Sequence, residues 1–140
     1  GRTYLYDKHE PLFPFGYGLS YTSFDYSGLK TDKTNAKESD IINVSFQLRN
    51  TGNFDSDEVS QLYISFPESK VERPVIALKG FKRTFVEKGK SVTVVIPLQT
   101  DELKYWDVEK HAFVLEKGKV NLSVGSSSKD LRLKGSITIQ

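Results

Sequence analysis

The feature that most constrains the fold is a repeated two-residue alternation of apolar and polar side chains. Between residues 42 and 48, every even-numbered residue is apolar and every odd-numbered residue is polar. Successive side chains of a β-strand point to opposite faces of its sheet, so this pattern predicts a strand with one buried face and one wet face. Similar runs at residues 59–66, 92–98 and 120–124 predict three more strands, of which 59–66 is expected to be central.

Shorter extended segments are predicted at residues 24–29, 75–86, 113–115 and 131–139. Turn-forming residues separate them from the longer runs. About seven short strands with almost no helix indicate an all-β fold, an antiparallel β-sandwich. We expect this sandwich to occupy residues 23–140. The absence of cysteine argues against a disulfide-bonded antibody-type domain.

Two local details follow from the same pattern. Residues 113–115 and 120–124 are expected to form a hairpin across the turn at residues 116–119. A single helical turn, capped by Thr100 or Asp101, is expected at residues 101–106.

Three glycines are predicted to interrupt or reverse strands. At Gly80 the apolar positions change from even, as at Leu78, to odd, as at Phe81, which indicates a β-bulge. Gly28 is a second candidate for a bulge. Gly52 lies in a run of turn formers and is expected to adopt a positive φ.

Residues 1–22 differ from the rest of the chain. Pro11 and Pro14 disfavour helix before them, and Gly16 permits unusual backbone angles, so an ordered, extended segment is expected. Eight aromatic residues lie between Tyr4 and Tyr26. Exposing each large side chain costs about 1.5–3 kcal/mol, so this segment is expected to pack against something.

Composition removes several classes of partner. The chain has 20 Lys and Arg against 18 Asp and Glu, with the signs interspersed, so no basic stripe for nucleic acid exists. No apolar run approaches the roughly 20 residues of a membrane span. The chain has no methionine and therefore no initiator, and we expect it to be a piece of a larger protein.

Metal and cofactor sites are not predicted. Asn53, Asp55, Asp57 and Glu58 resemble the start of a calcium loop, but the twelfth position is Ile64, where a bidentate glutamate is needed, so a solvated acidic turn is favoured.

The two imidazoles are weighed in the same way. His9 and His111 lie far apart in the sequence, and neither has the spacing of a metal site or a catalytic triad. Surface or packing roles are favoured for both.

Two possibilities for carbohydrate chemistry were weighed. Tyr105 and Trp106 are candidates for stacking on a sugar ring, although a lone tryptophan in a sandwich more often packs. A glycosidase needs two carboxyl groups facing each other across a cleft, and the acidic residues here fall mostly in turns. No catalytic residue is therefore expected.

Four blocks of sequence carry a resemblance to a known family. Residues 10–22 read Glu-Pro-Leu-Phe-Pro-Phe-Gly-Tyr-Gly-Leu-Ser-Tyr-Thr, which resembles the signature introducing the C-terminal fibronectin type III-like domain of family 3 glycoside hydrolases, the β-glucosidase and β-xylosidase group. Residues 50–63, 73–81 and 124–130 resemble later blocks of that domain in the same order. The chain departs from the pattern at Ser56, where a glycine is common, and at Val120, where an aromatic residue is common.

The resemblance implies a non-catalytic accessory domain that braces the catalytic domains of the same polypeptide. The parent would be a β-glucosidase-like enzyme of carbohydrate metabolism that hydrolyses O-glycosyl bonds of β-linked oligosaccharides, in the periplasm or after secretion. Its nucleophile and general acid belong to upstream domains, so no catalytic residue or cofactor is carried over. Side chains of the extended segment at residues 1–22 would cover the sandwich or contact the catalytic domains: Tyr4, Tyr6, Phe13, Phe15, Tyr17, Leu19 and Tyr21.

One alternative function stays open at this point. The chain could be an independent carbohydrate-binding or adhesive module that uses Tyr105, Trp106 or the aromatic segment directly. Retardation of the isolated chain by soluble β-glucans or xylans in affinity electrophoresis would favour that alternative.

Overall fold

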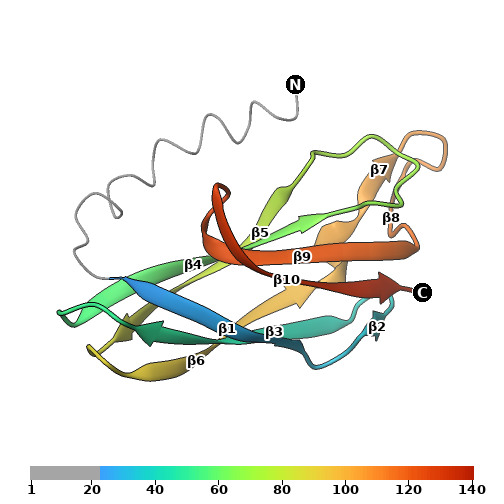
Figure 1. Cartoon of the computed structure of the whole chain (residues 1–140). Coiled ribbons are helices and arrows are strands. Elements are labelled where there is room, and N and C mark those ends of the chain that lie inside the picture. The colour runs from blue at the N-terminus through green and yellow to red at the C-terminus, as the bar shows by residue number, and fades with distance from the viewer. Residues whose placement is uncertain (1–22) are drawn as a thin grey trace.

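Alternating apolar residues give each long strand one face that is buried in a common core. The structure is a computed structural model that describes residues 23–140, and it shows two facing sheets with a small hairpin projecting at one end (Figure 1). The first sheet has the order β1-β3-β6 and the second has the order β2-β10-β9-β4-β5. The two sheets and their connections form the predicted β-sandwich.

The bounds of the strands follow the chain in order. The strands of the first sheet are β1 (Phe24–Thr31), β3 (Ile41–Asn50) and β6 (Ser91–Gln99). Those of the second are β2 (Asn35–Ala36), β4 (Ser56–Ser65), β5 (Ala77–Val86), β9 (Gly118–Ser127) and β10 (Asp130–Ile139). The hairpin consists of β7 (Tyr105–Asp107) and β8 (Ala112–Val114), preceded by a 3-10 turn at Thr100–Leu103. Seven of these strands have eight residues or more, which agrees with the predicted number.

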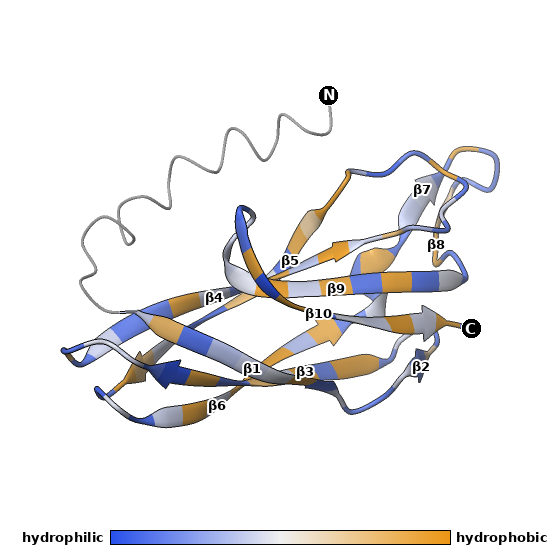
Figure 2. Ribbon diagram, viewed as in Figure 1, coloured by the Kyte–Doolittle hydropathy of each residue, from blue (hydrophilic) through white to orange (hydrophobic). Residues whose placement is uncertain are grey.

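The strand predicted at residues 42–48 is confirmed as the centre of the first sheet. Its even-numbered apolar residues are all completely buried, and they pair in register with buried residues of β6, as Phe46 does with Val94. Figure 2 shows this alternation as successive orange and blue bands along β3. The inner face of β3 therefore supplies much of the core.

Tyr26 connects the two sheets. Its ring stacks on Phe46, with centroids 5.6 Å apart, while its hydroxyl donates to Glu58 at 2.8 Å. The hydroxyl also lies 3.2 Å from Oγ of Ser60, which is completely buried. Burial raises the pKa of Tyr26, so the hydroxyl keeps its proton and remains a donor. One side chain of β1 thus fixes the position of β4 across the core.

The predicted bulge at Gly80 is confirmed, and its cause is a close approach. The register of β4 and β5 pairs Leu62 with Gly80 but Tyr63 with Leu78, so Lys79 is the extra residue. A Cβ on Gly80 would lie 2.7 Å from Cγ2 of Ile96 in the opposite sheet. The bulge thus coincides with a point where only glycine lets the sheets pack.

Gly28 and Gly52 behave differently from each other. Gly28 has a φ of 66° and lies at a register shift between β1 and β3, as predicted. The positive φ predicted for Gly52 is wrong, because the side chain of Asn50 forms this turn instead. Its Oδ1 accepts the N–H of Gly52 at 2.9 Å.

The segment around the 3-10 turn also differs from expectation. The turn ends at Leu103, and residues 105–107 are a strand, so the helical turn predicted at 101–106 is too long. No side chain caps it. The hydroxyl of Thr100 instead donates to the carbonyl of Lys37 at 2.8 Å.

The predicted hairpin between residues 113–115 and 120–124 is wrong. β8 pairs with β7, and β9 pairs with β4 and β10. The turn between β7 and β8 is closed by Asp107, whose Oδ1 accepts the N–H groups of Glu109 and Lys110 at 2.9 and 3.1 Å. A short local turn was therefore available that the apolar pattern did not reveal.

Replacing Gly80 by valine is expected to destabilise the domain by about 1–3 kcal/mol, because the added side chain overpacks the core against Ile96. Urea denaturation monitored by circular dichroism measures this change. Thr93→Val, on the exposed face of β6, and Gly52→Ala, at a residue without positive φ, are the controls and should each change stability far less. An unchanged midpoint for Gly80→Val would contradict the packing described for this position.

Candidate functional site

The sugar-stacking candidates lie at the end of the sandwich that carries its longest connections. There the loop between β4 and β5 lies beside the β7–β8 hairpin (Figure 1). The guanidinium of Arg73, from that loop, donates to the carbonyl of Leu103 at 2.9 Å. This contact fixes the loop against the base of the hairpin.

Arg73 is the centre of this end of the molecule. Its Cζ lies 3.8 Å from the ring centroid of Phe66 and 5.2 Å from that of Tyr105. Its Nη2 pairs with Glu116 at 3.1 Å, and its side chain is only 10% exposed. A planar guanidinium can stack and form directed hydrogen bonds at once, so one side chain holds three segments of the chain together.

Glu116 completes this arrangement on the strand side. It accepts from Oγ of Ser69 at 2.6 Å, from the backbone N–H of Lys70 at 2.8 Å and from Arg73. Burial acts to raise the pKa of Glu116, but these hydrogen bonds and the charge of Arg73 outweigh it, so the pKa lies below its ordinary value. Glu116 is therefore an ionised structural group at neutral pH.

Tyr105 and Trp106 do not share one surface, because neighbouring residues of a strand point to opposite faces. Tyr105 turns toward Arg73, whereas Trp106 pairs across the hairpin with Phe113. The rings of Trp106 and Phe113 are 5.1 Å apart at an interplanar angle of 73°, and the two residues are 51% and 64% exposed. Phe113 was missed as a partner because the predicted hairpin placed it elsewhere. Sugar stacking on Trp106 stays a prediction.

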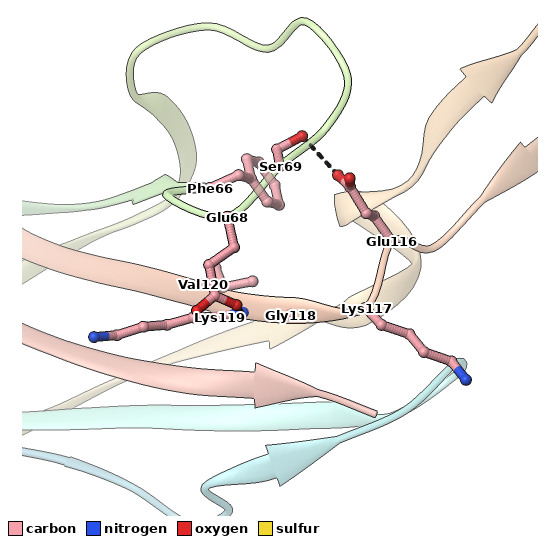
Figure 3. Close-up of a pocket in the computed structure, with 8 residues that line it drawn as sticks. All are labelled: Phe66, Glu68, Ser69, Glu116, Lys117, Gly118, Lys119 and Val120. Atoms are coloured by element: carbon pink, nitrogen blue, oxygen red, sulfur yellow. Dashed lines mark hydrogen bonds between the residues drawn. The ribbon is translucent and has the colours of Figure 1, made fainter.

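A small hollow lies between the loop after β4 and the start of β9 (Figure 3). Its volume of about 10 Å³ is at the lower limit for one water molecule. Figure 3 shows Ser69 and Glu116 joined by a hydrogen bond beside it. The hollow is too small for a sugar ring and is lined by Phe66, Glu68, Ser69, Glu116, Lys117, Gly118, Lys119 and Val120.

The acidic residues that resemble a calcium loop point to separate partners. Asp55 accepts a backbone N–H of the β5–β6 turn at 2.8 Å, and Asp57 pairs with the exposed guanidinium of Arg83 at 2.8 Å. Glu58 faces inward to Tyr26, and burial raises the pKa of its carboxyl group. Within residues 23–140, no group of three or more His, Asp or Glu side chains is arranged to hold a metal ion.

Several other predicted residues can be placed briefly. His111 lies in the β7–β8 turn with a φ of 49°. His9 and the proposed contact residues lie outside the described residues, and the latter are Tyr4, Tyr6, Phe13, Phe15, Tyr17, Leu19 and Tyr21. In the part of the chain that the structure describes, no helix is long and apolar enough to cross a membrane.

Comparison with known proteins defines the class. The family model for the fibronectin type III-like domain matches residues 58–128, which include β4, β5, β6 and β9. The chain belongs to the fibronectin type III-like domain family.

Its similar proteins are much longer enzymes. The chain is 39% identical over 130 residues to thermostable beta-glucosidase B of Acetivibrio thermocellus, covering 93% of this chain and 17% of that protein. It superimposes on beta-glucosidase D2-BGL from Chaetomella raphigera with a TM-score of 0.79 and 36% identity, covering 88% of this chain and 19% of the other. For the GH3 beta-glucosidase of Bifidobacterium adolescentis the TM-score is 0.78 at 29% identity, with coverage of 86% and 18%. The chain thus spans less than a fifth of the length of these relatives.

Replacing Glu116 by glutamine is expected to destabilise the domain by about 1–3 kcal/mol at neutral pH, because Arg73 stays buried without a carboxylate. The folded pKa of Glu116 lies below its ordinary value of 4.5, so its contribution is present above pH 4.5 and is lost as the pH falls through the folded pKa. The difference between variant and wild type should therefore shrink in acid. Denaturant titrations at several pH values measure it.

Asp57→Asn is the matched control, since it breaks an ion pair whose side chains are 73% and 35% exposed. Its effect should be below about 1 kcal/mol. Equal effects of the two substitutions would contradict the structural role given to Glu116.

Proposed function

We propose that this domain is a non-catalytic accessory part of a family 3 glycoside hydrolase and that it braces the catalytic domains of the same polypeptide. The observation that carries this proposal is the coverage. The chain matches about nine-tenths of its own length but less than a fifth of the β-glucosidases that resemble it. The reaction of such an enzyme then requires protein beyond this chain.

The chemistry of the described residues supports a non-catalytic role. Glycoside hydrolysis needs two carboxyl groups about 5–5.5 Å apart in retaining enzymes, or about 6.5–9.5 Å apart in inverting ones, with a sugar between them. Glu116 and Glu58 are engaged by Arg73 and Tyr26, and the hollow beside Glu116 holds at most a water molecule. A carboxylate that is held ionised by an arginine does not donate the proton that the leaving group needs.

The proposed parent activity is that of a β-glucosidase, which hydrolyses O-glycosyl bonds in β-linked glucosides. The domain would contribute through its surface. A domain that folds around its own core adds stability to a neighbour by burying apolar surface at about 25 cal/mol per Å². Bracing of this kind raises the thermal stability of the enzyme and leaves the substrate pocket unchanged.

The isolated chain is expected to fold and to hydrolyse neither aryl β-glucosides nor aryl β-xylosides, because it has a complete core but no carboxylate pair at a cleft. Release of the aryl group, followed by absorbance, measures this. Turnover that survives repurification and disappears when one carboxylate of this chain is neutralised would overturn the proposal.

A further inference from the structure

The outer face of β4 and β5 carries an exposed apolar surface. Leu62 and Ile64 point into the core, so the odd-numbered residues of β4 point outward. The register pairs Gln61 with Phe81 and Asp57 with Phe85, and residues paired across strands share a face. Phe81 and Phe85 therefore lie on the outside of the sandwich.

The exposure of this face is high for residues of their type. Phe81 is 69% exposed and Phe85 is 60% exposed, and Val59, between them on the neighbouring strand, is 39% exposed. We call Val59, Leu78, Phe81 and Phe85 the outer patch. Neighbouring exposed apolar side chains mark a surface that binds something.

The same face also contains a buried polar pair. Gln61 and Tyr63 are 2% and 3% exposed, and the Tyr63 hydroxyl donates to Oε1 of Gln61 at 2.6 Å. Both residues point away from the core, since they alternate with Leu62 and Ile64. A shielded hydrogen bond beside exposed phenylalanines is the composition of an interface, in which polar pairs accompany aromatic contacts.

The first described residue is tied to the end of β5. The backbone N–H of Thr51 donates to the carbonyl of Ser23 at 2.9 Å, which holds the start of the described chain beside the end of β3. The neighbouring Asn50 donates through its Nδ2 to the carbonyl of Val86 at 2.9 Å. Residues 1–22 therefore join the domain next to Phe85, at one end of the outer patch.

The sequence of residues 13–21 matches this surface in period and length. Its odd-numbered residues are Phe13, Phe15, Tyr17, Leu19 and Tyr21, the alternation of an extended segment with one apolar face. At about 3.3 Å per residue these nine residues span about 30 Å, close to the length of the ten-residue β5. Both the chemistry and the point of attachment agree.

We propose that residues 13–21 of this chain dock on the outer patch, with their odd-numbered side chains against Phe81 and Phe85. The segment runs from the Phe85 end toward Leu78 as the sequence number falls from Tyr21 to Phe13. The even-numbered positions then face away from the domain. They are Pro14, Gly16, Gly18 and Ser20, which are small and let another backbone approach closely. This inference concerns the chain alone and does not depend on the parent activity.

Paramagnetic labelling of the full chain tests this directly, since the protein has no cysteine and one introduced thiol is unique. A nitroxide on Leu12→Cys should broaden the amide signals of Leu78 and Phe81 strongly and that of Phe85 less. The amides of Gln47 and Thr93, on the outer face of the other sheet, should keep their intensity. Broadening at those two residues, or none in β5, would overturn the proposal.

Two further measurements exclude other occupants. Phe81→Asp with Phe85→Asp, both at exposed positions, should restore the lost signals in the labelled chain, whereas Thr93→Asp should not. Mixing labelled chain with unlabelled isotope-enriched chain should leave the enriched signals unchanged. Broadening in that mixture would assign the patch to a second copy and overturn the proposal. So would an unprotected patch in the isolated chain that becomes protected from hydrogen exchange only in a longer protein with catalytic domains.

Discussion

The burial of every second side chain of β3 is the interaction on which the rest of the structure depends. Ile42, Val44, Phe46 and Leu48 are completely buried between the two sheets. Full burial of such a side chain is worth about 1.5–3 kcal/mol, so this one strand contributes a large part of what opposes the conformational entropy of the chain. The other strands are ordered because their own alternate residues pack against this row.

This frame determines what polar side chains can do at its ends. Because the core fixes β4 and β9, the loop after β4 is held by one buried guanidinium that connects Phe66, Tyr105 and Glu116. The same frame leaves one face of β4 and β5 pointing away from the core, where Phe81 and Phe85 are exposed. The structure therefore separates a self-sufficient core from a surface suited to contact. That division fits a domain that stabilises a larger enzyme and performs no chemistry.

Local periodicity predicted the strands but not all of their partners. The alternation at residues 42–48 and the change of phase at Gly80 are properties of neighbouring residues, and both were confirmed. The pairing of Trp106 with Phe113 depends on a turn closed by Asp107, which the apolar pattern does not reveal. The Gly52 prediction was wrong because the Asn50 side chain, and not glycine, forms that turn.

The candidate site shows the same limit more strongly. Arg73 and Glu116 are 43 positions apart, and no spacing rule joins an arginine in a loop to a glutamate before a distant strand. The separation of Tyr105 from Trp106, in contrast, follows from strand alternation once β7 is recognised as a strand. The family resemblance indicated which kind of protein contains this domain, and the structure showed which surfaces are available to it.

The measurement that tests the bracing role most directly is thermal inactivation of the parent β-glucosidase carrying Phe13→Ala or Phe15→Ala, with its Michaelis constant determined in parallel. Our account predicts inactivation at a lower temperature with a nearly unchanged Michaelis constant, because the segment supports the enzyme without touching substrate. Unchanged stability together with a sharply altered substrate preference would contradict it and would place the segment at the rim of the active site.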